Sequence, residues 1–347
     1  MPDFYDISIK EIKQETAQAV SVLFDIPANL KETFSFTAGE YITLQKEING
    51  ETVRRAYSIC SAPNSGELRV AIKKVPDGTF SVDAVDNFKA GDSLQVAPPE
   101  GRFLLNPEAN KNYLAVAAGS GITPILSMVK DTLEKQPSAT FTLIYGNRSI
   151  ADTMFFNELN ELDEANANFN LEYVYSRERN PDCKFGRIDK GLTNLFVKNK
   201  YKDISFDAAF LCGPEEMINT VSDTLQENGF DKEQVHFELF SVSVDEEATE
   251  QIDDGSCKVE ILLDDEVFSF DMDKTDNVLA ASLRNDVDAP YSCQGGVCSS
   301  CLAKVTEGKA VMVKNSILTD AEVEEGYILT CQAHPTTTTL KVDFDDV

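Results

Sequence analysis

Four cysteines near the end of the chain have a spacing that suits a metal cluster. Cys293, Cys298 and Cys301 form a C-x4-C-x2-C pattern, and 29 residues separate Cys301 from Cys331. This arrangement is typical of proteins that hold a 2Fe–2S cluster and differs from the paired C-x2-C knuckles of zinc sites. The small residues between the first three cysteines let backbone amides turn toward the sulfurs and stabilise added negative charge. The spacing therefore predicts a 2Fe–2S cluster, with zinc and coincidental buried cysteines as the alternatives.

The region around these cysteines, residues 256–347, resembles a plant-type ferredoxin domain of the β-grasp fold. The resemblance includes the sequence Leu-Thr-Cys at 329–331. It implies a single cluster that takes up one electron at a time. The implied ligands are Cys293, Cys298, Cys301 and Cys331. The other four cysteines are scattered along the chain, and the default interpretation of each is a small buried residue.

A glycine-rich turn in the middle of the chain has the features of a phosphate site. Gly119 and Gly121 follow an apolar strand and precede a helical pattern that opens with Thr123 and Pro124. The glycines permit a tight turn, Thr123 suits a helix cap, and Pro124 suits the first helical position. Amides at a helix N-terminus can bind a pyrophosphate. Because Pro124 replaces the third glycine of the dinucleotide fingerprint, the motif alone leaves nucleotide binding and an ordinary turn equally open.

A second turn, Leu211-Cys212-Gly213-Pro214, also ends a strand and precedes a helix. Ligands of parallel sheets lie outside the carboxyl ends of the strands, so both turns can line one crevice. In this interpretation Cys212 borders the nicotinamide; the alternative is a small buried residue that closes the strand.

The end of another strand carries groups that suit a phosphate on the adenosine ribose. Ser176 and Arg177 end the strand, and Arg187 follows ten residues later. A hydroxyl and guanidinium groups suit a 2′-phosphate, whereas an acidic residue would suit a free ribose hydroxyl. We therefore expect NADPH rather than NADH, although solvated surface arginines are common.

Two short motifs in the first hundred residues suit a flavin. Arg55, Tyr57 and Ser58 lie on a probable strand and offer a guanidinium for phosphate, a ring for stacking and a hydroxyl for a ring nitrogen. Gly78-Thr79-Phe80-Ser81 follows a second strand. An ordinary barrel strand is the alternative for the first motif taken alone.

Taken together, residues 1–240 resemble the ferredoxin–NADP reductase superfamily. The resemblance implies a flavin-binding antiparallel barrel followed by a nicotinamide-binding α/β domain. It assigns Arg55, Tyr57 and Ser58 to the flavin, with Ser58 near N5. The residues assigned to the FAD pyrophosphate are Gly78, Thr79, Phe80 and Ser81. The residues assigned to the nicotinamide nucleotide are Gly121, Thr123, Cys212, Gly213 and Pro214.

The segment Phe237-Glu238-Leu239-Phe240 resembles the close of that reductase module. The resemblance places Glu238 and Phe240 beside the flavin ring, and a core strand is the alternative. The residues expected at the reacting rings are then Ser58, Cys212, Glu238 and Phe240.

Hydrophobic patterning predicts the elements that position these residues. Short alternating runs with frequent glycines over 1–105 predict a β-barrel, and strand–helix alternation over 106–240 predicts a doubly wound parallel sheet. An acidic segment at 241–255 is expected to be a solvated linker, or else a surface loop. The resemblance described above assigns 256–347 to a ferredoxin-type domain. The expected elements are strands at 113–118, 140–145, 171–175 and 208–211, helices from 124 and at 154–162, a hairpin of 257–263 and 266–272, and a helix at 278–285. The fold class is thus multidomain, α+β and α/β.

The charge balance excludes some partners. The chain has 347 residues, with 31 Lys+Arg against 59 Asp+Glu and a net charge of −28. Nucleic acid and anionic membranes are disfavoured because both are bound mainly through Lys and Arg. Residues 1–13 are too charged for an export signal, and glycines and Pro124 interrupt the longest uncharged window. We expect a cytoplasmic protein without membrane insertion.

The order of the three modules resembles the reductase components of multicomponent oxygenases, most of all those of the phenylacetyl-CoA epoxidase (ring-1,2-epoxidising) systems. The resemblance implies that NADPH reduces FAD by hydride transfer and that electrons pass singly through the cluster to an oxygenase. The alternatives are a reductase for a hydroxylase, dioxygenase, desaturase or other metalloprotein, and a non-catalytic redox-sensing module. Residues 241–347 carry 23 Asp+Glu against 7 Lys+Arg, a net −16. We therefore expect an acceptor protein with a basic docking patch.

Overall fold

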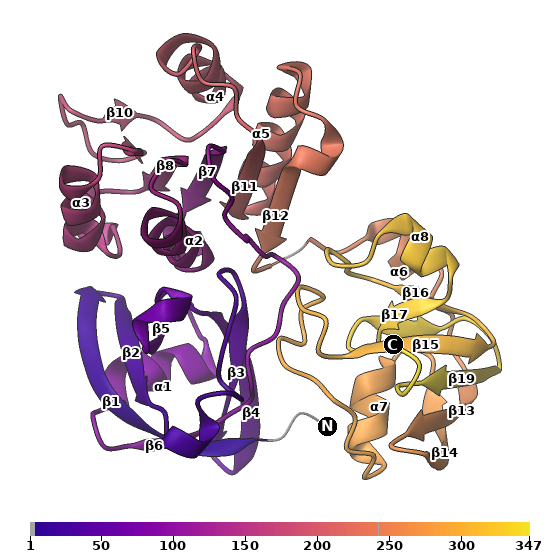
Figure 1. The fold of residues 1–347 in the computed structure, drawn as a ribbon. Helices are drawn as coiled ribbons and strands as arrows, with labels where there is room; N and C mark the ends of the chain where they lie inside the picture. Colours follow the sequence, from indigo (N-terminus) through magenta and orange to yellow (C-terminus); the bar gives the residue numbers. More distant parts are fainter. Residues whose placement is uncertain (1–3, 242) are drawn as a thin grey trace. The chain divides into compact units, whose positions relative to one another are not determined.

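The computed structural model describes residues 4–241 and 243–347 and separates into two compact units (Figure 1). The N-terminal unit is Phe4–Glu238, and the C-terminal unit begins at Leu239 and ends at Val347. No helix within the described residues is both long and apolar enough to cross a bilayer.

The N-terminal unit begins with a six-stranded antiparallel sheet of order β4-β3-β6-β1-β2-β5. The two ends of this order meet, since Ile59 forms a bridge with Val70 and the Cys60 amide donates to the Arg69 carbonyl at 2.8 Å. The sheet is therefore closed into the predicted barrel. Its elements are β1 (Tyr5–Thr16), β2 (Ala19–Asp25), β3 (Tyr41–Ile48), β4 (Glu51–Ser58), β5 (Leu68–Lys73), α1 (Thr79–Asn87) and β6 (Ser93–Val96).

A parallel sheet follows the barrel in the same unit, as its strand–helix alternation predicts. The sheet order is β10-β9-β8-β7-β11-β12, and β7 pairs in parallel with both β8 and β11. The chain moves outward from β7 in one direction and returns on the other side, so the strand order reverses between β7 and β11. The strands are β7 (Asn112–Ala118), β8 (Thr140–Asn147), β9 (Phe169–Tyr175), β10 (Lys184–Phe185), β11 (Ala208–Gly213) and β12 (Val235–Leu239). The main helices are α2 (Ile122–Lys135), α3 (Phe156–Ala165), α4 (Lys190–Asn194) and α5 (Glu215–Glu227).

The C-terminal unit is built on a mixed five-stranded sheet of order β14-β13-β19-β15-β17, with β13 and β19 parallel. The predicted hairpin is confirmed: Asp264 and Asp265 form its turn with φ of 53° and 62°, as a tight hairpin requires. A small two-stranded sheet of β16 and β18 adjoins it. The elements are β13 (Ser256–Leu263), β14 (Glu266–Asp273), α7 (Val278–Arg284), β15 (Leu302–Glu307), β16 (Ala310–Met312), α8 (Asp320–Glu324), β17 (Tyr327–Leu329), β18 (Ala333–Pro335) and β19 (Thr339–Asp343).

The acidic segment predicted to be a solvated linker is partly structured. It contains a short helix, α6 (Glu246–Glu250), because the Asp245 side chain accepts a hydrogen bond from the Ala248 amide and caps the first turn. The Asp245 amide donates to the Val313 carbonyl at 2.8 Å, and Ala248 is buried. This part of the segment is therefore attached to the C-terminal unit, which the acidic composition alone did not indicate.

Candidate functional site

The two glycine turns of the N-terminal unit pack directly against each other. A Cβ atom on Gly121 would lie 2.1 Å from the Cys212 carbonyl oxygen, and one on Gly213 would lie 3.1 Å from the Ala118 Cβ. Only glycine at 121 allows this approach. The turns follow β7 and β11, the neighbouring strands between which the order reverses, and ligands of such sheets bind at that place.

The helix after the first turn begins earlier than predicted. α2 starts at Ile122 with Gly121 as its N-cap, so Pro124 occupies the third helical position. The Thr123 hydroxyl donates to the Ser120 carbonyl at 3.1 Å instead of capping the helix. The first-turn amides thus have no side-chain cap, and no acidic residue lies in the first turn. By contrast, α5 opens with Glu215 and Glu216, so α2 is the helix that suits a pyrophosphate.

Lys73 also lies at the first turn and was not predicted as a site residue. It ends β5, and its Nζ is 3.7 Å from the position of a Cβ on Gly119. Burial lowers the pKa of Lys73, and the nearby Arg148 acts in the same direction, whereas the Asp152 carboxylate opposes the shift. No motif marks this lysine, since it is the last residue of an ordinary barrel strand. The structure thus places a lysine side chain beside the first glycine turn.

Ser58 and Glu238 meet although 180 positions separate them. The Ser58 hydroxyl donates to Glu238 Oε2 at 3.3 Å, and both side chains are buried. Cys212 is completely buried; this burial, with the Glu238 carboxylate nearby, raises the pKa of its thiol well above the ordinary value. The barrel, the end of β11 and β12 thus place three of the four predicted ring-contacting residues together. Phe240, the fourth, belongs to the C-terminal unit and is 41% exposed, and its place beside a flavin stays a prediction.

The two predicted flavin motifs of the barrel lie near each other. The rings of Tyr57 and Phe80 are 5.8 Å apart, and burial raises the pKa of Tyr57. Arg55 donates to the Arg54 carbonyl at 2.7 Å and stays half-buried. Arg55 and Tyr57 are two positions apart on β4, so their side chains lie on the same face of the strand.

The segment 78–81 forms the start of α1. Gly78 is the N-cap residue without a side-chain bond, and the Ser81 hydroxyl accepts from the Val75 amide at 3.1 Å. Phe80 is 1% exposed, so its side chain belongs to the barrel core. Phe80 can therefore serve a phosphate only through its backbone amide, whereas Thr79 is exposed.

The predicted ribose-phosphate groups gather at the end of β9. β10 pairs with β9 in register Phe185 to Tyr175, and the Gly186 amide donates to the Tyr175 carbonyl at 2.9 Å. This pairing brings Arg187 to the strand end that carries Ser176 and Arg177. The Arg177 amide also donates to the carbonyl of Arg148, so a third exposed arginine, which was not predicted, lies nearby.

The four predicted cluster ligands, which lie in the C-terminal unit together with Cys257, form two pairs. The Cys298 and Cys293 sulfurs are 3.1 Å apart, and the Cys301 thiol donates to Cys331. Across residues 4–241 and 243–347, no three His, Cys, Asp or Glu side chains are grouped to hold a single ion. Four thiols in two pairs are instead the donor set that a two-iron cluster needs, with one pair for each iron.

Backbone amides of the loop at 293–301 point toward these sulfurs, as predicted. The Gly295 amide donates to Cys293 Sγ at 3.3 Å, and the Gly296 amide donates to the Cys331 sulfur. The bonds from the Cys298 thiol and the loop amides lower the pKa of Cys293 to about 7. Gly296 has φ of 72°, and a Cβ there would lie 2.8 Å from the Lys314 carbonyl oxygen. These hydrogen bonds favour the thiolate at Cys293, and the pKa of Cys331 is lowered in the same way, whereas donation to these two sulfurs, together with burial, raises the pKa of Cys298 and Cys301. The loop amides thus suit a cluster whose sulfurs carry negative charge.

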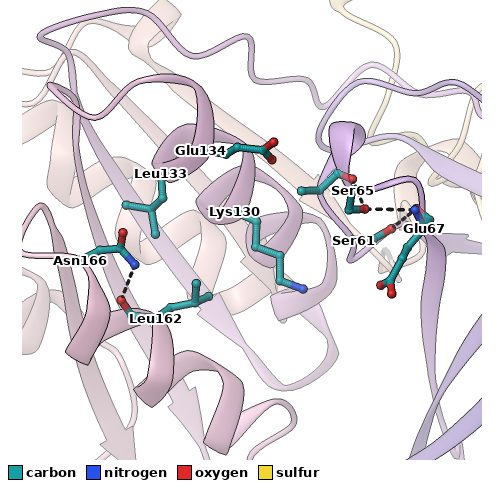
Figure 2. Close-up of a pocket in the computed structure, with 9 residues that line it drawn as sticks. Ser61, Ser65, Glu67, Lys130, Leu133, Glu134, Leu162 and Asn166 are labelled. Atoms are coloured by element: carbon teal, nitrogen blue, oxygen red, sulfur yellow. Dashed lines mark hydrogen bonds between the residues drawn. The ribbon is translucent and has the colours of Figure 1, made fainter.

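The N-terminal unit also contains a hollow of about 520 Å³ that does not include the predicted nucleotide or flavin residues (Figure 2). Its lining includes Ser61, Glu67 and Lys130, and none of the predicted site residues. Lys130 donates to the Cys60 carbonyl at 3.1 Å and pairs with Glu158, so its charge is already compensated. No ligand is assigned to this hollow.

Three family models match successive parts of the chain. An oxidoreductase FAD-binding domain matches residues 6–104, an oxidoreductase NAD-binding domain matches 115–223, and a 2Fe-2S iron-sulfur cluster binding domain matches 261–336. One component of the Escherichia coli 1,2-phenylacetyl-CoA epoxidase is 36% identical over 99% of both chains. The chain belongs to the family of oxygenase reductase components that includes this epoxidase subunit. The ferredoxin reductase component of 3-ketosteroid-9-alpha-monooxygenase from Rhodococcus rhodochrous, a further relative, is 32% identical over 97% of this chain and 96% of its own.

Solved structures of the family's fold agree. Phthalate dioxygenase reductase has a TM-score of 0.65 at 24% identity and covers 98% of both chains. A ferredoxin NADP+ reductase from Neisseria gonorrhoeae has a TM-score of 0.58 at 22% identity and covers 68% of this chain and 98% of its own. The expected fold class is confirmed. As a member of the family, the chain is an NAD(P)H oxidoreductase with FAD, a pyridine nucleotide and a 2Fe–2S cluster as cofactors.

Proposed function

We propose that this chain passes electrons from NADPH, through FAD and the 2Fe–2S cluster, to an oxygenase of the phenylacetyl-CoA epoxidase type. The identity of 36% to the Escherichia coli epoxidase component extends over 99% of both chains and supports this acceptor. The 3-ketosteroid-9-alpha-monooxygenase reductase at 32% identity supports the wider class, a reductase for another oxygenase, as the second candidate.

The observation that carries the proposal is the arrangement of the four cysteines in two thiol pairs within a loop of inward-facing amides. Such a site suits a 2Fe–2S cluster, which accepts one electron at a time, and the same polypeptide also contains an NAD-binding domain. In the proposed ligand set, one iron takes Cys293 and Cys298, and the other takes Cys301 and Cys331.

The hydride step is proposed to occur where Ser58, Cys212 and Glu238 meet. Bound FAD supplies the chemistry, because a flavin accepts a hydride and gives up electrons singly. The Ser58 hydroxyl, fixed by its bond to Glu238, orients the ring, and the buried Cys212 thiol excludes water from the nicotinamide face. Phe240 is proposed to cover the flavin. The FAD pyrophosphate is assigned to residues 78–81, and Arg55 and Tyr57 to the rest of the flavin.

The nicotinamide nucleotide is proposed to lie across the two packed turns. The N-terminus of α2 at Gly121 and Thr123, with Lys73 beside it, takes the pyrophosphate, and Gly213 and Pro214 border the nicotinamide half. NADPH is favoured over NADH because Ser176, Arg177 and Arg187 gather at one strand end. The carboxylate of the neighbouring Glu178 accepts from the Ile150 amide, and Arg187 forms an exposed ion pair with Glu216 at 3.9 Å.

The proposed boundaries follow the predicted modules: a FAD-binding barrel at 1–105, a nucleotide domain at 106–240, a linker at 241–255 and a ferredoxin-type domain at 256–347. The net −16 of residues 241–347 supports an acceptor that presents a basic docking patch. We also propose a cytoplasmic location, since all eight cysteines are free thiols.

The test is reconstitution with purified oxygenase subunits of the phenylacetyl-CoA epoxidase type. We expect NADPH oxidation coupled to formation of the ring epoxide of phenylacetyl-CoA. The matched control uses the oxygenase component of a 3-ketosteroid monooxygenase with its own substrate. Coupling only in the control would replace the proposed acceptor, and a colourless purified protein that holds zinc but no iron or flavin would overturn the reductase assignment itself.

A further inference from the structure

Gln332 follows the last cysteine, and its buried side chain faces that cysteine. Its Nε2 lies 3.0 Å from the Gln294 carbonyl oxygen, 2.9 Å from the Cys331 carbonyl oxygen and 3.7 Å from Cys331 Sγ. The side chain is only 8% exposed. A carbonyl oxygen can only accept, so the two carbonyls fix the amide with its NH2 group on this side. The NH2 group has two hydrogens, so one N–H bonds to the Gln294 carbonyl and the other is shared between the Cys331 carbonyl and the more distant Cys331 sulfur.

The same side chain joins the two parts of the chain that supply the thiol pairs. Gln294 lies in the loop that carries Cys293 and Cys298, whereas Gln332 lies next to Cys331. The backbone holds Gln332 in place independently, since its amide donates to the Leu329 carbonyl at 2.9 Å and its carbonyl accepts from the Val313 amide at 3.1 Å. The donor is thus fixed before any cluster is bound.

We propose that Gln332 raises the reduction potential of the cluster through the N–H that its side chain shares between the Cys331 carbonyl and the Cys331 sulfur. Reduction adds one electron and no proton, so the sulfurs of the reduced cluster carry more negative charge. A donor to a sulfur stabilises the reduced form more than the oxidised form, and burial strengthens this difference. Gln332 does not bind iron; its side chain stabilises the negative charge on the sulfur of a ligand. The inference rests on the proposed ligand set.

The test is a redox titration of the cluster, followed by electron paramagnetic resonance, in the full-length protein and in Gln332→Leu. Leucine keeps a similar volume and removes the donor. We expect the equilibrium between reduced and oxidised cluster to move about tenfold toward the oxidised form, which is about 59 mV for a one-electron couple. The signal intensity of the reduced cluster should remain that of the unaltered protein.

Thr330→Val is the matched control. Thr330 is completely buried and also adjoins Cys331, but its hydroxyl donates to the Cys301 carbonyl at 3.0 Å, not to a sulfur. We expect this variant to keep the potential of the unaltered protein. An equal shift in Thr330→Val would assign the effect to packing near the cysteine and would overturn the inference.

Gln332→Met is a second variant with a flexible side chain that lacks a donor. A potential that stays the same in both the leucine and methionine variants would overturn the role of Gln332. Loss of the cluster from both would make Gln332 a structural residue and would also overturn it. These outcomes differ from a failure of the proposed function, in which the unaltered protein itself would show no signal of a reduced 2Fe–2S cluster.

Discussion

The two units of the chain build their chemical sites in opposite ways. In the N-terminal unit, Ser58 meets Glu238 and Gly121 meets Cys212, so the site is assembled from the ends of strands that are far apart in sequence. In the C-terminal unit, three of the four predicted cluster ligands lie in one irregular loop. Helices and strands hold the residues of the first site in place, whereas hydrogen bonds from backbone amides of the loop hold the sulfurs of the second.

This difference decides what a mutation destroys. A site made of strand ends loses geometry when two backbones are forced apart, but its binding groups remain. A site made of thiol ligands loses its cofactor when one ligand is removed. The two units should therefore fail separately.

The largest effect is expected from Cys298→Ser. The serine replaces one buried thiol of the first pair, so the cluster should be lost and reduction of the oxygenase should fall to background. Reduction of ferricyanide by NADPH, which flavin alone can support, should remain within about twofold of the unaltered protein. Iron content and both activities are measured together. Unaltered oxygenase reduction in the serine variant would mean that electrons bypass the C-terminal unit.

The next effect concerns the contact between the two turns. In Gly121→Ala, the new Cβ would lie 2.1 Å from the Cys212 carbonyl oxygen, so the turns must separate. Because a misplacement of about 1 Å can cost about 10²-fold, we expect flavin reduction to slow by about that factor. The cluster signal should stay intact. Rapid mixing with NADPH under anaerobic conditions measures the rate.

Gly191→Ala is the control for that variant. Gly191 lies in α4, and its Cβ would meet only the Asp189 side chain at 3.3 Å. We expect an unchanged rate and, if anything, a more stable helix, since alanine favours helices over glycine by about 1 kcal/mol. A slow rate in the control as well would show that flavin reduction is sensitive to the domain in general, not to the turn contact.

A third experiment addresses the acidic surface of the C-terminal unit. If the net −16 of residues 241–347 steers a basic acceptor, electron transfer to the oxygenase should fall about tenfold as ionic strength rises from roughly 0.01 to 0.15 M, where the Debye length shortens from about 30 to 8 Å. Reduction of flavin by NADPH is measured over the same range. If flavin reduction and electron transfer to the oxygenase depended equally on salt, the acidic surface would have no specific role in docking of the acceptor.

The sequence predicted the cysteine site more completely than the site of the N-terminal unit, because short motifs record local spacing but not tertiary packing. Cysteine spacing is local, so the ligand set and the loop amides were accessible without a fold. The strand ends were also predicted, but the bond between Ser58 and Glu238 depends on how barrel and sheet pack, which no short pattern records. Lys73 was missed because the role proposed for it depends only on its distance to the Gly119 turn.

Local competition between side chains explains the smaller differences. Thr123 was expected to cap α2, but its hydroxyl bonds to the Ser120 carbonyl within a helix that starts earlier. The acidic segment was expected to be solvated, yet Asp245 caps a short helix and its amide bonds to the Val313 carbonyl. In both cases one polar group had two possible partners, and tertiary structure selected between them.

The smallest effect separates two cations within the nucleotide site. Arg177 is exposed, so Arg177→Ala should raise the KM for NADPH by a few-fold and leave the KM for NADH unchanged. Lys73→Met should raise both, because Lys73 lies at the turn assigned to the pyrophosphate that the two nucleotides share. Since burial lowers the pKa of Lys73, binding of both nucleotides should weaken with rising pH, and at a lower pH than an ordinary lysine would lose its proton. Steady-state kinetics with each nucleotide measures all three effects. Equal effects of Arg177→Ala on NADPH and NADH would refute the assignment of the 2′-phosphate to the end of β9.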